Sequence, residues 1–436
     1  MKINYYSFII LSLLVSCSTS SYLNQKNLAH LYQKDKMFIH PTIQVFHIND
    51  SLTNVLLMYN SIDLLHISNE ETNSFFADLT VSYNLYKSME SSVSLQSGSI
   101  TFNHKSVVND SNHVISGKIK LKIKNDEKYV LELLHSDINR NHTHQNFYSI
   151  DKLTPNSAQN FILNDKNGNI IFGNTVQPGD SFIIKHNKKE PNIYCRYYNR
   201  HFVTSAPPFS INNPKPFDYD ADSTFTTKAF DTIQLSDTGF YHFQVDTLTT
   251  NGFTVFCFNP AFPYISTTEE MISSLRYLTS KKEFQNIIES KSKKEELDKF
   301  WLKNSSSPER AKYLIKTYYN RVQDANLFFT SFKEGWKTDR GMIYVVFGPP
   351  STIYKSSENE SWIYGSEKNY LSYNFNFVNV DNPFTDNDFM LNRSNVYRYS
   401  WSQAIETWRR GKVYNVTDIK REQDERRLRQ QMHFWY

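Results

Sequence analysis

The pattern of apolar and polar positions changes twice along the chain. Between residues 40 and 155, β-branched and aromatic residues recur at every second position in short runs. Clusters of Asn, Asp, Ser and His separate these runs, as turns separate short strands. In Ile115–Lys124 apolar residues alternate with lysines, which is typical of an antiparallel strand with one wet face. Residues 40–155 are therefore predicted to form a β-sandwich. Its predicted strands are Thr42–Ile48, Asn54–Tyr59, Phe75–Tyr86, Ser92–Phe102, Val114–Lys124 and Tyr129–Leu134.

A second sandwich is predicted for residues 156–260. Asn167-Gly168 supplies the positive φ angles of a tight turn, so the flanking apolar runs should form a hairpin. Asp237, Gly239 and Tyr241 recur at alternate positions, which resembles the tyrosine corner of immunoglobulin-like sandwiches. The resemblance implies that the Tyr241 hydroxyl folds back onto the corner and that Phe243 stands where antibody domains carry cysteine. It implies an architecture and no binding activity.

Beyond Pro260 the apolar period becomes helical. Thr267 or Thr268, followed by two glutamates, predicts one helix start, and Ser307-Pro308 predicts another. The second helix should run to Phe332. Its predicted inward residues are Tyr313, Leu314, Tyr318, Val322, Ala325 and Phe329.

After this helix the pattern predicts a small sheet. Met342–Phe347 is nearly all apolar, which favours a central strand ended by Gly348-Pro349-Pro350. Trp362–Tyr364 and Leu371–Val380 are predicted to pair beside it. The expected fold is therefore mainly β with an α+β C-terminal domain. Two Ig-like sandwiches precede a helical segment and a three-stranded antiparallel sheet within residues 261–415.

The chain begins with a segment that predicts export. Lys2 precedes the apolar run Tyr5–Val15, which is too short to span a bilayer. Leu14-Val15-Ser16-Cys17 resembles a bacterial lipobox, which implies acylation of Cys17 and removal of residues 1–16. The alternative is an ordinary secretory signal. Residues 17–39 would then be a tether or a short helix, and the absence of an acidic run after Cys17 favours a periplasm-facing outer-membrane location.

Composition excludes some classes of function. The chain has 48 Lys+Arg against 44 Asp+Glu, so it lacks the basic excess of a nucleic-acid-binding protein. With 32 Phe and 28 Tyr in 436 residues, extensive disorder is disfavoured. Beyond Cys17 only Cys195 and Cys257 remain, which allows one disulfide or none. Residues 416–436 are predicted to be a charged helix or tail.

One motif is distinctive. The run Gly335-Trp336-Lys337-Thr338-Asp339, followed by Gly341 and Gly348-Pro349-Pro350, resembles the signature of the GWxTD-domain family. That family occurs at the C-termini of envelope proteins of Bacteroidetes and some other bacteria. The resemblance covers about residues 262–415 and implies no reaction, cofactor or catalytic residue.

The motif's residues allow two interpretations. Gly335 would end a helix in the left-handed conformation, Trp336 would be a core anchor and Thr338–Gly341 a tight turn. Alternatively, Asp339 and Arg340 would form a polar pair beside an exposed edge of Trp336 and contact a peptide or glycan. The candidate binding residues are Gly335, Trp336, Thr338, Asp339, Arg340, Gly348, Pro349, Pro350 and Trp362.

No catalytic residue, cofactor or metal site is predicted. His135, His142 and His144 have a spacing that zinc could use, but a polar loop explains their surroundings better. Asp218–Asp222 resembles half a calcium loop without its glycine and closing glutamate, and is predicted to be an acidic turn.

The sequence predicts a non-catalytic outer-membrane lipoprotein that binds or scaffolds an envelope protein or peptide. In this hypothesis the two sandwiches hold the GWxTD domain away from Cys17. One alternative is a glycan- or peptide-hydrolysing enzyme with its site between the second sandwich and the GWxTD domain. Another is carbohydrate binding by exposed aromatic side chains.

Overall fold

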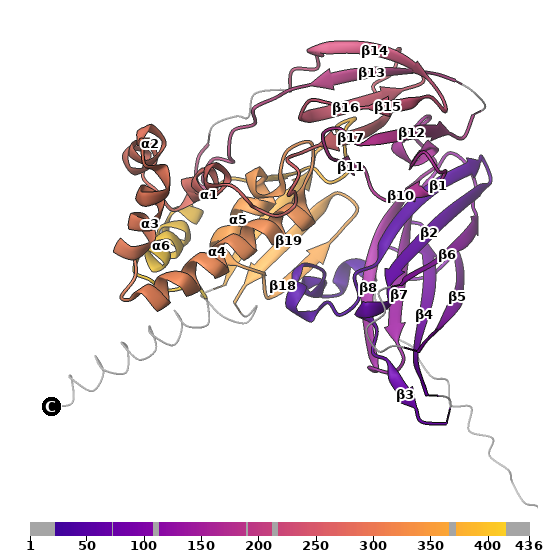
Figure 1. Ribbon diagram of the computed structural model, residues 1–436, viewed down its shortest axis with the longest axis horizontal. Helices are drawn as coiled ribbons and strands as arrows, with labels where there is room; N and C mark the ends of the chain where they lie inside the picture. Colours follow the sequence, from indigo (N-terminus) through magenta and orange to yellow (C-terminus); the bar gives the residue numbers. More distant parts are fainter. Residues whose placement is uncertain are drawn as a thin grey trace, which may run out of the picture.

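The computed structural model confirms a mainly β chain whose helices gather in the C-terminal part (Figure 1). The structure describes residues 22–71, 73–107, 113–188, 191–211, 217–365 and 372–415. The predictions for the signal segment 1–16, for Cys17 and for the tail 416–436 lie outside these ranges. Within them, no helix combines the length and the apolar character needed to cross a membrane.

The first sandwich has two antiparallel sheets. One has the order β1-β2-β6, and in the other β4 lies between β5 and the strands β3 and β7, with β8 beyond β7. Val55 and Leu57 of the first sheet share a core with Leu79 and Leu133 of the second. The strands are β1 (Thr42–Asn49), β2 (Leu52–Asn60), β3 (Ile67–Asn69), β4 (Ser74–Tyr86), β5 (Gln96–Ser106), β6 (Val114–Lys122), β7 (Lys128–Asp137) and β8 (His142–Asp151).

The second sandwich packs a four-stranded sheet, β10-β9-β12-β15, on a five-stranded one, β11-β17-β16-β13-β14. The Tyr241 hydroxyl donates to the Asp237 carbonyl at 2.9 Å, as the tyrosine-corner resemblance implied. The sequence allowed one disulfide or none between Cys195 and Cys257. In the structure both cysteines are buried and free, so they form no disulfide. The strands are β9 (Phe161–Asn164), β10 (Ile170–Ile171), β11 (Thr175–Val176), β12 (Ser181–His186), β13 (Asn192–Tyr198), β14 (Ser223–Lys228), β15 (Thr232–Gln234), β16 (Gly239–Gln244) and β17 (Phe253–Cys257).

Several helices begin where a side chain caps them. Thr267 and Glu270 form a capping box at α1, and Ser307 caps α4 with Pro308 in its first turn, as predicted. Tyr313 is half exposed, so its predicted inward position is wrong. The helical elements beyond residue 260 are α1 (Thr268–Ser274), η6 (Leu275–Tyr277), α2 (Lys281–Glu289), α3 (Lys293–Lys303), α4 (Pro308–Phe329), η7 (Gly335–Lys337), α5 (Asp339–Phe347) and α6 (Tyr397–Arg409), where η denotes a 3-10 helix; the sandwiches contain η4 (Ser61–Asp63) and η5 (Ala158–Asn160).

The prediction that Met342–Phe347 is a central strand is wrong, because these residues lie in α5. All nine residues of this helix are buried, so its apolar run has no period that could distinguish a helix from a strand. The predicted turn Thr338–Gly341 is instead the N-cap and first turn of α5. The small antiparallel sheet follows this helix and has four strands, in the order β18-β19-β20-β21. They are β18 (Thr352–Lys355), β19 (Asn359–Tyr364), β20 (Tyr373–Asn379) and β21 (Phe389–Leu391).

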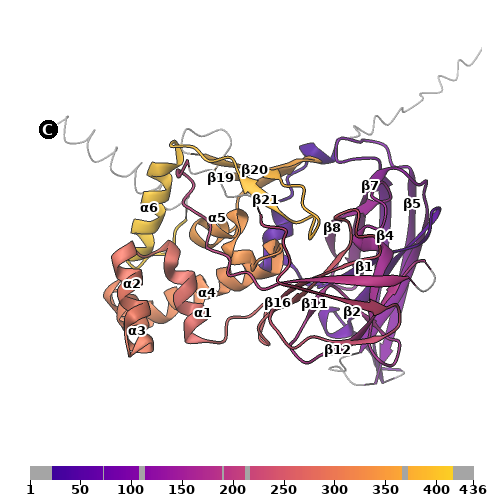
Figure 2. The same ribbon diagram turned by 90° about the horizontal axis from the view of Figure 1, so that it is seen from above.

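Residues 22–36, which we call the N-terminal strap, pack against the C-terminal sheet. The strap contains η1 (Leu23–Gln25), η2 (Ala29–Tyr32) and η3 (Lys34–Lys36). Leu28 donates its backbone N–H to Ile353 of β18 at 2.8 Å, and the Leu28 side chain is fully buried in the core of the C-terminal part. Figure 1 shows the strap in indigo beside β18, and Figure 2 shows the helices at the opposite end of the molecule from the first sandwich.

Candidate functional site

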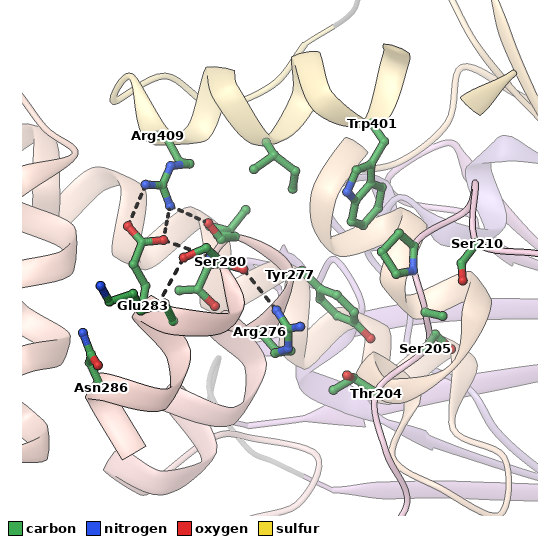
Figure 3. Close-up of a pocket in the computed structure, with 16 residues that line it drawn as sticks. Thr204, Ser205, Ser210, Arg276, Tyr277, Ser280, Glu283, Asn286, Trp401 and Arg409 are labelled. Atoms are coloured by element: carbon green, nitrogen blue, oxygen red, sulfur yellow. Dashed lines mark hydrogen bonds and ion pairs between the residues drawn. The ribbon is translucent and has the colours of Figure 1, made fainter. Parts of the chain in front are cut away.

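An open groove of about 920 Å³ lies between the second sandwich's long connection and the helices (Figure 3). One wall is the segment 204–210, which belongs to the connection between β13 and β14. The other walls come from η6, the start of α2, and α6. The groove therefore assembles from three stretches of chain that are distant in the sequence.

A capping box shapes one end of the groove. Ser280 caps α2, and the Glu283 carboxylate accepts a hydrogen bond from the Ser280 backbone N–H at 2.9 Å. The same carboxylate accepts two hydrogen bonds from Arg409 of α6, at 2.7 and 2.9 Å. The hydrogen bonds from Arg409 hold the pKa of Glu283 at about 2. Glu283 is therefore ionised and paired at neutral pH.

The other end is aromatic. Tyr277 and Trp401 lie edge to face with ring centroids 6.5 Å apart, and both are buried behind the groove surface. The Tyr277 hydroxyl donates to the Trp336 carbonyl at 2.7 Å, and Ser205 donates its backbone N–H and its hydroxyl to the Lys337 carbonyl. The motif's Gly335–Lys337 turn thus fixes both the aromatic wall and the wall formed by residues 204–210.

The charge of the groove is positive. Its lining has three cationic side chains, Arg276, Lys282 and Arg409, and one carboxylate, Glu283. Arg276 donates to the Thr279 carbonyl at 3.1 Å and lies over the Phe284 ring. Within the described part of the chain, no carboxylate forms an ion pair with Arg276 or Lys282. Two positive charges therefore remain available to an anionic ligand.

The residues that the motif suggested for binding lie mostly inside the protein. Of those nine, Pro349 is exposed, and the other eight are buried: Gly335, Trp336, Thr338, Asp339, Arg340, Gly348, Pro350 and Trp362. Thr338 accepts a hydrogen bond from the Gly341 N–H at 3.0 Å and donates to the Gly335 carbonyl at 2.7 Å. These side chains therefore hold the domain together rather than facing the groove.

The glycines of the motif have roles different from the predicted one. Gly335 does not adopt the left-handed conformation, and it begins η7 instead of ending a helix. A Cβ atom at Gly335 would lie 1.9 Å from the Ala325 carbonyl oxygen, so the glycine permits η7 to touch α4. Gly348, at φ +83°, is the residue that ends the following helix.

Asp339 and Arg340 do not pair with each other. The Asp339 carboxylate forms a bidentate ion pair with Arg393, with hydrogen bonds of 2.6 and 2.8 Å. It also accepts a hydrogen bond from the Leu391 N–H at 2.7 Å. Arg393 also donates to the Ala206 carbonyl at 3.3 Å. Asp339 thus positions an arginine that holds the extended wall of the groove.

Arg340 enters a buried network around Glu360. The Glu360 side chain is fully buried and accepts from Arg340 at 3.0 Å, Lys355 at 2.8 Å, the Tyr32 hydroxyl at 3.0 Å and the Trp362 indole at 3.0 Å. Burial by itself would raise the pKa of Glu360, but Lys355 and Arg340 lower it to about 2. The carboxylate is therefore charged and fully partnered, which is typical of a structural ion cluster.

The histidines and aspartates singled out in the sequence also have structural surroundings. His142 and His144 lie on β8 and not in a polar loop, and His135 faces His144 across the β7–β8 pair. In the described ranges, no three His, Cys, Asp or Glu side chains are grouped to hold a metal ion. In the acidic turn, Arg200 lies between the carboxylates of Asp218 and Asp222.

Sequence reasoning missed the groove residues. The spacing of Ser280 and Glu283 predicts a capping box, but nothing in the sequence indicates that Arg409 pairs with it. Arg276, Lys282 and Trp401 carry no motif, because a groove built from distant segments leaves no local pattern.

Comparison with known proteins agrees with the motif. A family model described as the GWxTD domain matches residues 239–410. The match begins at β16, earlier than the predicted boundary at residue 261, so it includes two strands of the second sandwich. No curated protein matches the chain.

Proposed function

We propose that this chain, whose residues 239–410 match the GWxTD domain, is a non-catalytic lipoprotein anchored in the outer membrane through Cys17. Its groove binds an extended, acidic segment of an envelope protein. The observation that carries the proposal is the open groove with two unpaired cations. The lipobox resemblance of residues 14–17 supports the location.

The shape of the groove suits an extended peptide. Its 204–210 wall is an irregular stretch whose backbone is fixed to the GWxTD domain through Ser205 and through Arg393. The lining combines hydroxyl side chains and one amide with apolar side chains, as peptide-binding grooves do. Arg276 and Lys282 would then select a segment that carries carboxylates.

The lining favours binding over hydrolysis. A glycosidase needs two carboxyl groups, one of them protonated near neutral pH, and the lining has only Glu283. Its pKa of about 2 prevents it from acting as a general acid. The lining also contains no histidine or cysteine that could activate a nucleophile.

Carbohydrate binding has less support. Sugar-binding surfaces present aromatic rings to solvent, and the five tryptophans in the described ranges are at most 6% exposed. Tyr264, Tyr313 and Tyr399 are exposed, but none of them lines the groove. Trp401 lines the groove but is only 6% exposed, so it offers little ring surface for stacking.

Site-specific photocrosslinking tests the proposal. A photoreactive residue at Asn286, which is exposed and lines the groove, should capture an envelope protein in intact cells. The matched position is Gln285, which is exposed on the same helix but outside the groove lining, and it should give no such adduct.

Charge reversal provides the second control. Lys282→Glu should reduce the Asn286 adduct by about tenfold, which corresponds to about 1.4 kcal/mol of binding free energy. Lys281→Glu makes the same change one residue away, outside the groove lining, and should leave the adduct unchanged. Equal adducts from Gln285 and Asn286, or no response to Lys282→Glu, would contradict binding in the groove.

A further inference from the structure

The N-terminal strap is fixed to the C-terminal part at both of its ends. Near its start, Leu23 is 1% exposed, and the Asn27 side chain accepts a hydrogen bond from the Ile353 N–H at 3.1 Å. Near its end, the Tyr32 carbonyl accepts from the Tyr344 hydroxyl at 3.0 Å. The strap is therefore part of the folded C-terminal unit.

This packing limits how far a lipid on Cys17 can lie from that unit. Cys17 precedes Tyr22 by five residues. A fully extended chain spans at most about 3.6 Å per residue, so the anchor lies within about 18 Å of the strap. The two sandwiches consequently cannot hold the GWxTD domain away from an acylated Cys17, in contrast to the arrangement expected from the order of the domains in the sequence.

One loop of the first sandwich shares this location. We call the segment 87–95 the β4–β5 loop. In this loop the Met89 carbonyl accepts a hydrogen bond from the Asn24 N–H at 3.0 Å. Met89 is buried in the core of the C-terminal part, and Glu90 accepts two hydrogen bonds from Ser357, at 2.9 and 2.6 Å. These contacts hold the loop beside the first residues of the strap.

The same loop exposes apolar side chains. Val93 is 72% exposed and Leu95 is 60% exposed, and nearby Tyr22 at the start of the strap is 47% exposed. Ser91, Ser92 and Ser94 flank these two apolar side chains, and the loop's two charged residues, Lys87 and Glu90, come before them in the sequence, with Glu90 hydrogen-bonded to Ser357. Residues 91–95 of the loop carry no charge, so they can enter a lipid headgroup region without burying one.

We propose that the β4–β5 loop is a lipid-contacting surface, with Val93 and Leu95 inserted into the membrane interface beside the acylated Cys17. The proposal rests on the lipid anchor of the proposed function. A second apolar contact next to the anchor fixes the orientation of the whole molecule, since a single point of attachment would leave it free to rotate. In that orientation, the first sandwich and the C-terminal sheet would both lie next to the bilayer on the side of the molecule that carries the strap.

The test uses single cysteines that carry an environment-sensitive fluorophore. Cys195 and Cys257 are 1% and 0% exposed, so an introduced Val93→Cys in the full lipidated chain is labelled selectively. In vesicles that contain spin-labelled lipid, its emission should shift to the blue and be quenched. Leu248→Cys, on a second-sandwich hairpin and 94% exposed, should show neither effect.

The outcomes separate this inference from the anchor itself. Mass spectrometry of the same sample determines whether Cys17 is acylated. An acylated chain whose Val93 label is quenched no more than the Leu248 label overturns the lipid-contacting surface and leaves the anchor standing. Shielding of Val93 from an aqueous quencher without quenching by lipid indicates a protein neighbour and also overturns it. An unacylated Cys17 overturns both proposals.

Discussion

The Tyr32 hydroxyl donates a hydrogen bond of 3.0 Å to the Glu360 carboxylate across 328 positions of sequence. Both residues are buried, and the Tyr32 ring also packs edge to face on Phe329 with centroids 4.8 Å apart. The strap therefore completes the charged centre of the C-terminal part. This relationship makes the N-terminus of the described chain and the GWxTD domain a single folding unit.

Removing the Tyr32 hydroxyl should destabilise that unit. In Tyr32→Phe the ring remains, but Glu360 loses one of its hydrogen-bond donors, which should cost about 1.5–3 kcal/mol of unfolding free energy. Tyr22→Phe removes a hydroxyl from an exposed ring of the same strap and should change stability by less than about 0.5 kcal/mol. Urea denaturation of the two variants tests the difference, and equal stabilities would contradict this role for Tyr32.

Neutralising Glu360 should have a larger effect. Glu360→Gln leaves the buried Arg340 and the partly buried Lys355 without their counter-ion, which should cost about 3–5 kcal/mol. Glu358→Gln, two positions earlier and exposed, is the matched control and should be nearly neutral. Thermal unfolding measures both. A Glu360→Gln chain as stable as the control would show that the network contributes little.

Gly335, which precedes α5, should tolerate no side chain. In Gly335→Ala the new Cβ would lie 1.9 Å from a backbone oxygen, which cannot move away by a rotamer change. We expect a loss of about 3 kcal/mol or more from the displacement of η7 from α4. Gly168→Ala is the control, because Gly168 has a positive φ but no atom within 4 Å. It should lose only the conformational cost of about 1–2 kcal/mol, as measured by the same unfolding experiment.

The elements that depend on local pattern could be predicted from the sequence. Lys118, Lys120 and Lys122 alternate with apolar residues, and they point to solvent from β6 as expected. Thr267 and Ser307 cap their helices because their side chains reach N–H groups only three residues away. Such signals are contained within a few residues of the chain.

The rest depends on contacts between distant residues. Met342–Phe347 is apolar on every side because α5 lies in the centre of the domain, and such a run has the composition of a buried strand. Arg340 could not be paired with Glu360, nor Arg409 with Glu283, because ion pairs between separate elements leave no spacing rule. The groove has no sequence signature for the same reason.

Thiol accessibility should distinguish the structure from a disulfide-bridged chain. Cys195 and Cys257 are buried, and burial raises the pKa of both thiols, to about 11 for Cys257. In the folded protein these two thiols should therefore not react with a maleimide, and in the denatured protein both should react without a reductant. If the denatured protein reacts with maleimide at these two positions only after a reductant is added, the two cysteines form a disulfide and this prediction is contradicted. A Cys195→Ser variant, with one reactive thiol after denaturation, calibrates the count.

Acid should destabilise the protein through its buried histidines before its carboxylates titrate. Burial lowers the pKa of His135 to about 3, and the nearby His144 to about 4, from an ordinary value of 6.5. Below pH 6.5 the unfolded chain binds protons at these positions and the folded chain does not, so the folded state loses stability as pH falls.

Each such histidine contributes a slope of the unfolding free energy that approaches 1.4 kcal/mol per pH unit between about pH 6 and 4.5. The depressed carboxylates Glu360 and Glu283 add to the loss mainly below about pH 5, because the unfolded chain is half protonated at their ordinary pKa of 4.5. Urea unfolding at pH 7, 6 and 5 should therefore show a slope that His135→Leu reduces, whereas replacement of the exposed His201 with Leu leaves it unchanged. An identical slope in the two variants would mean that His135 is protonated in the folded state.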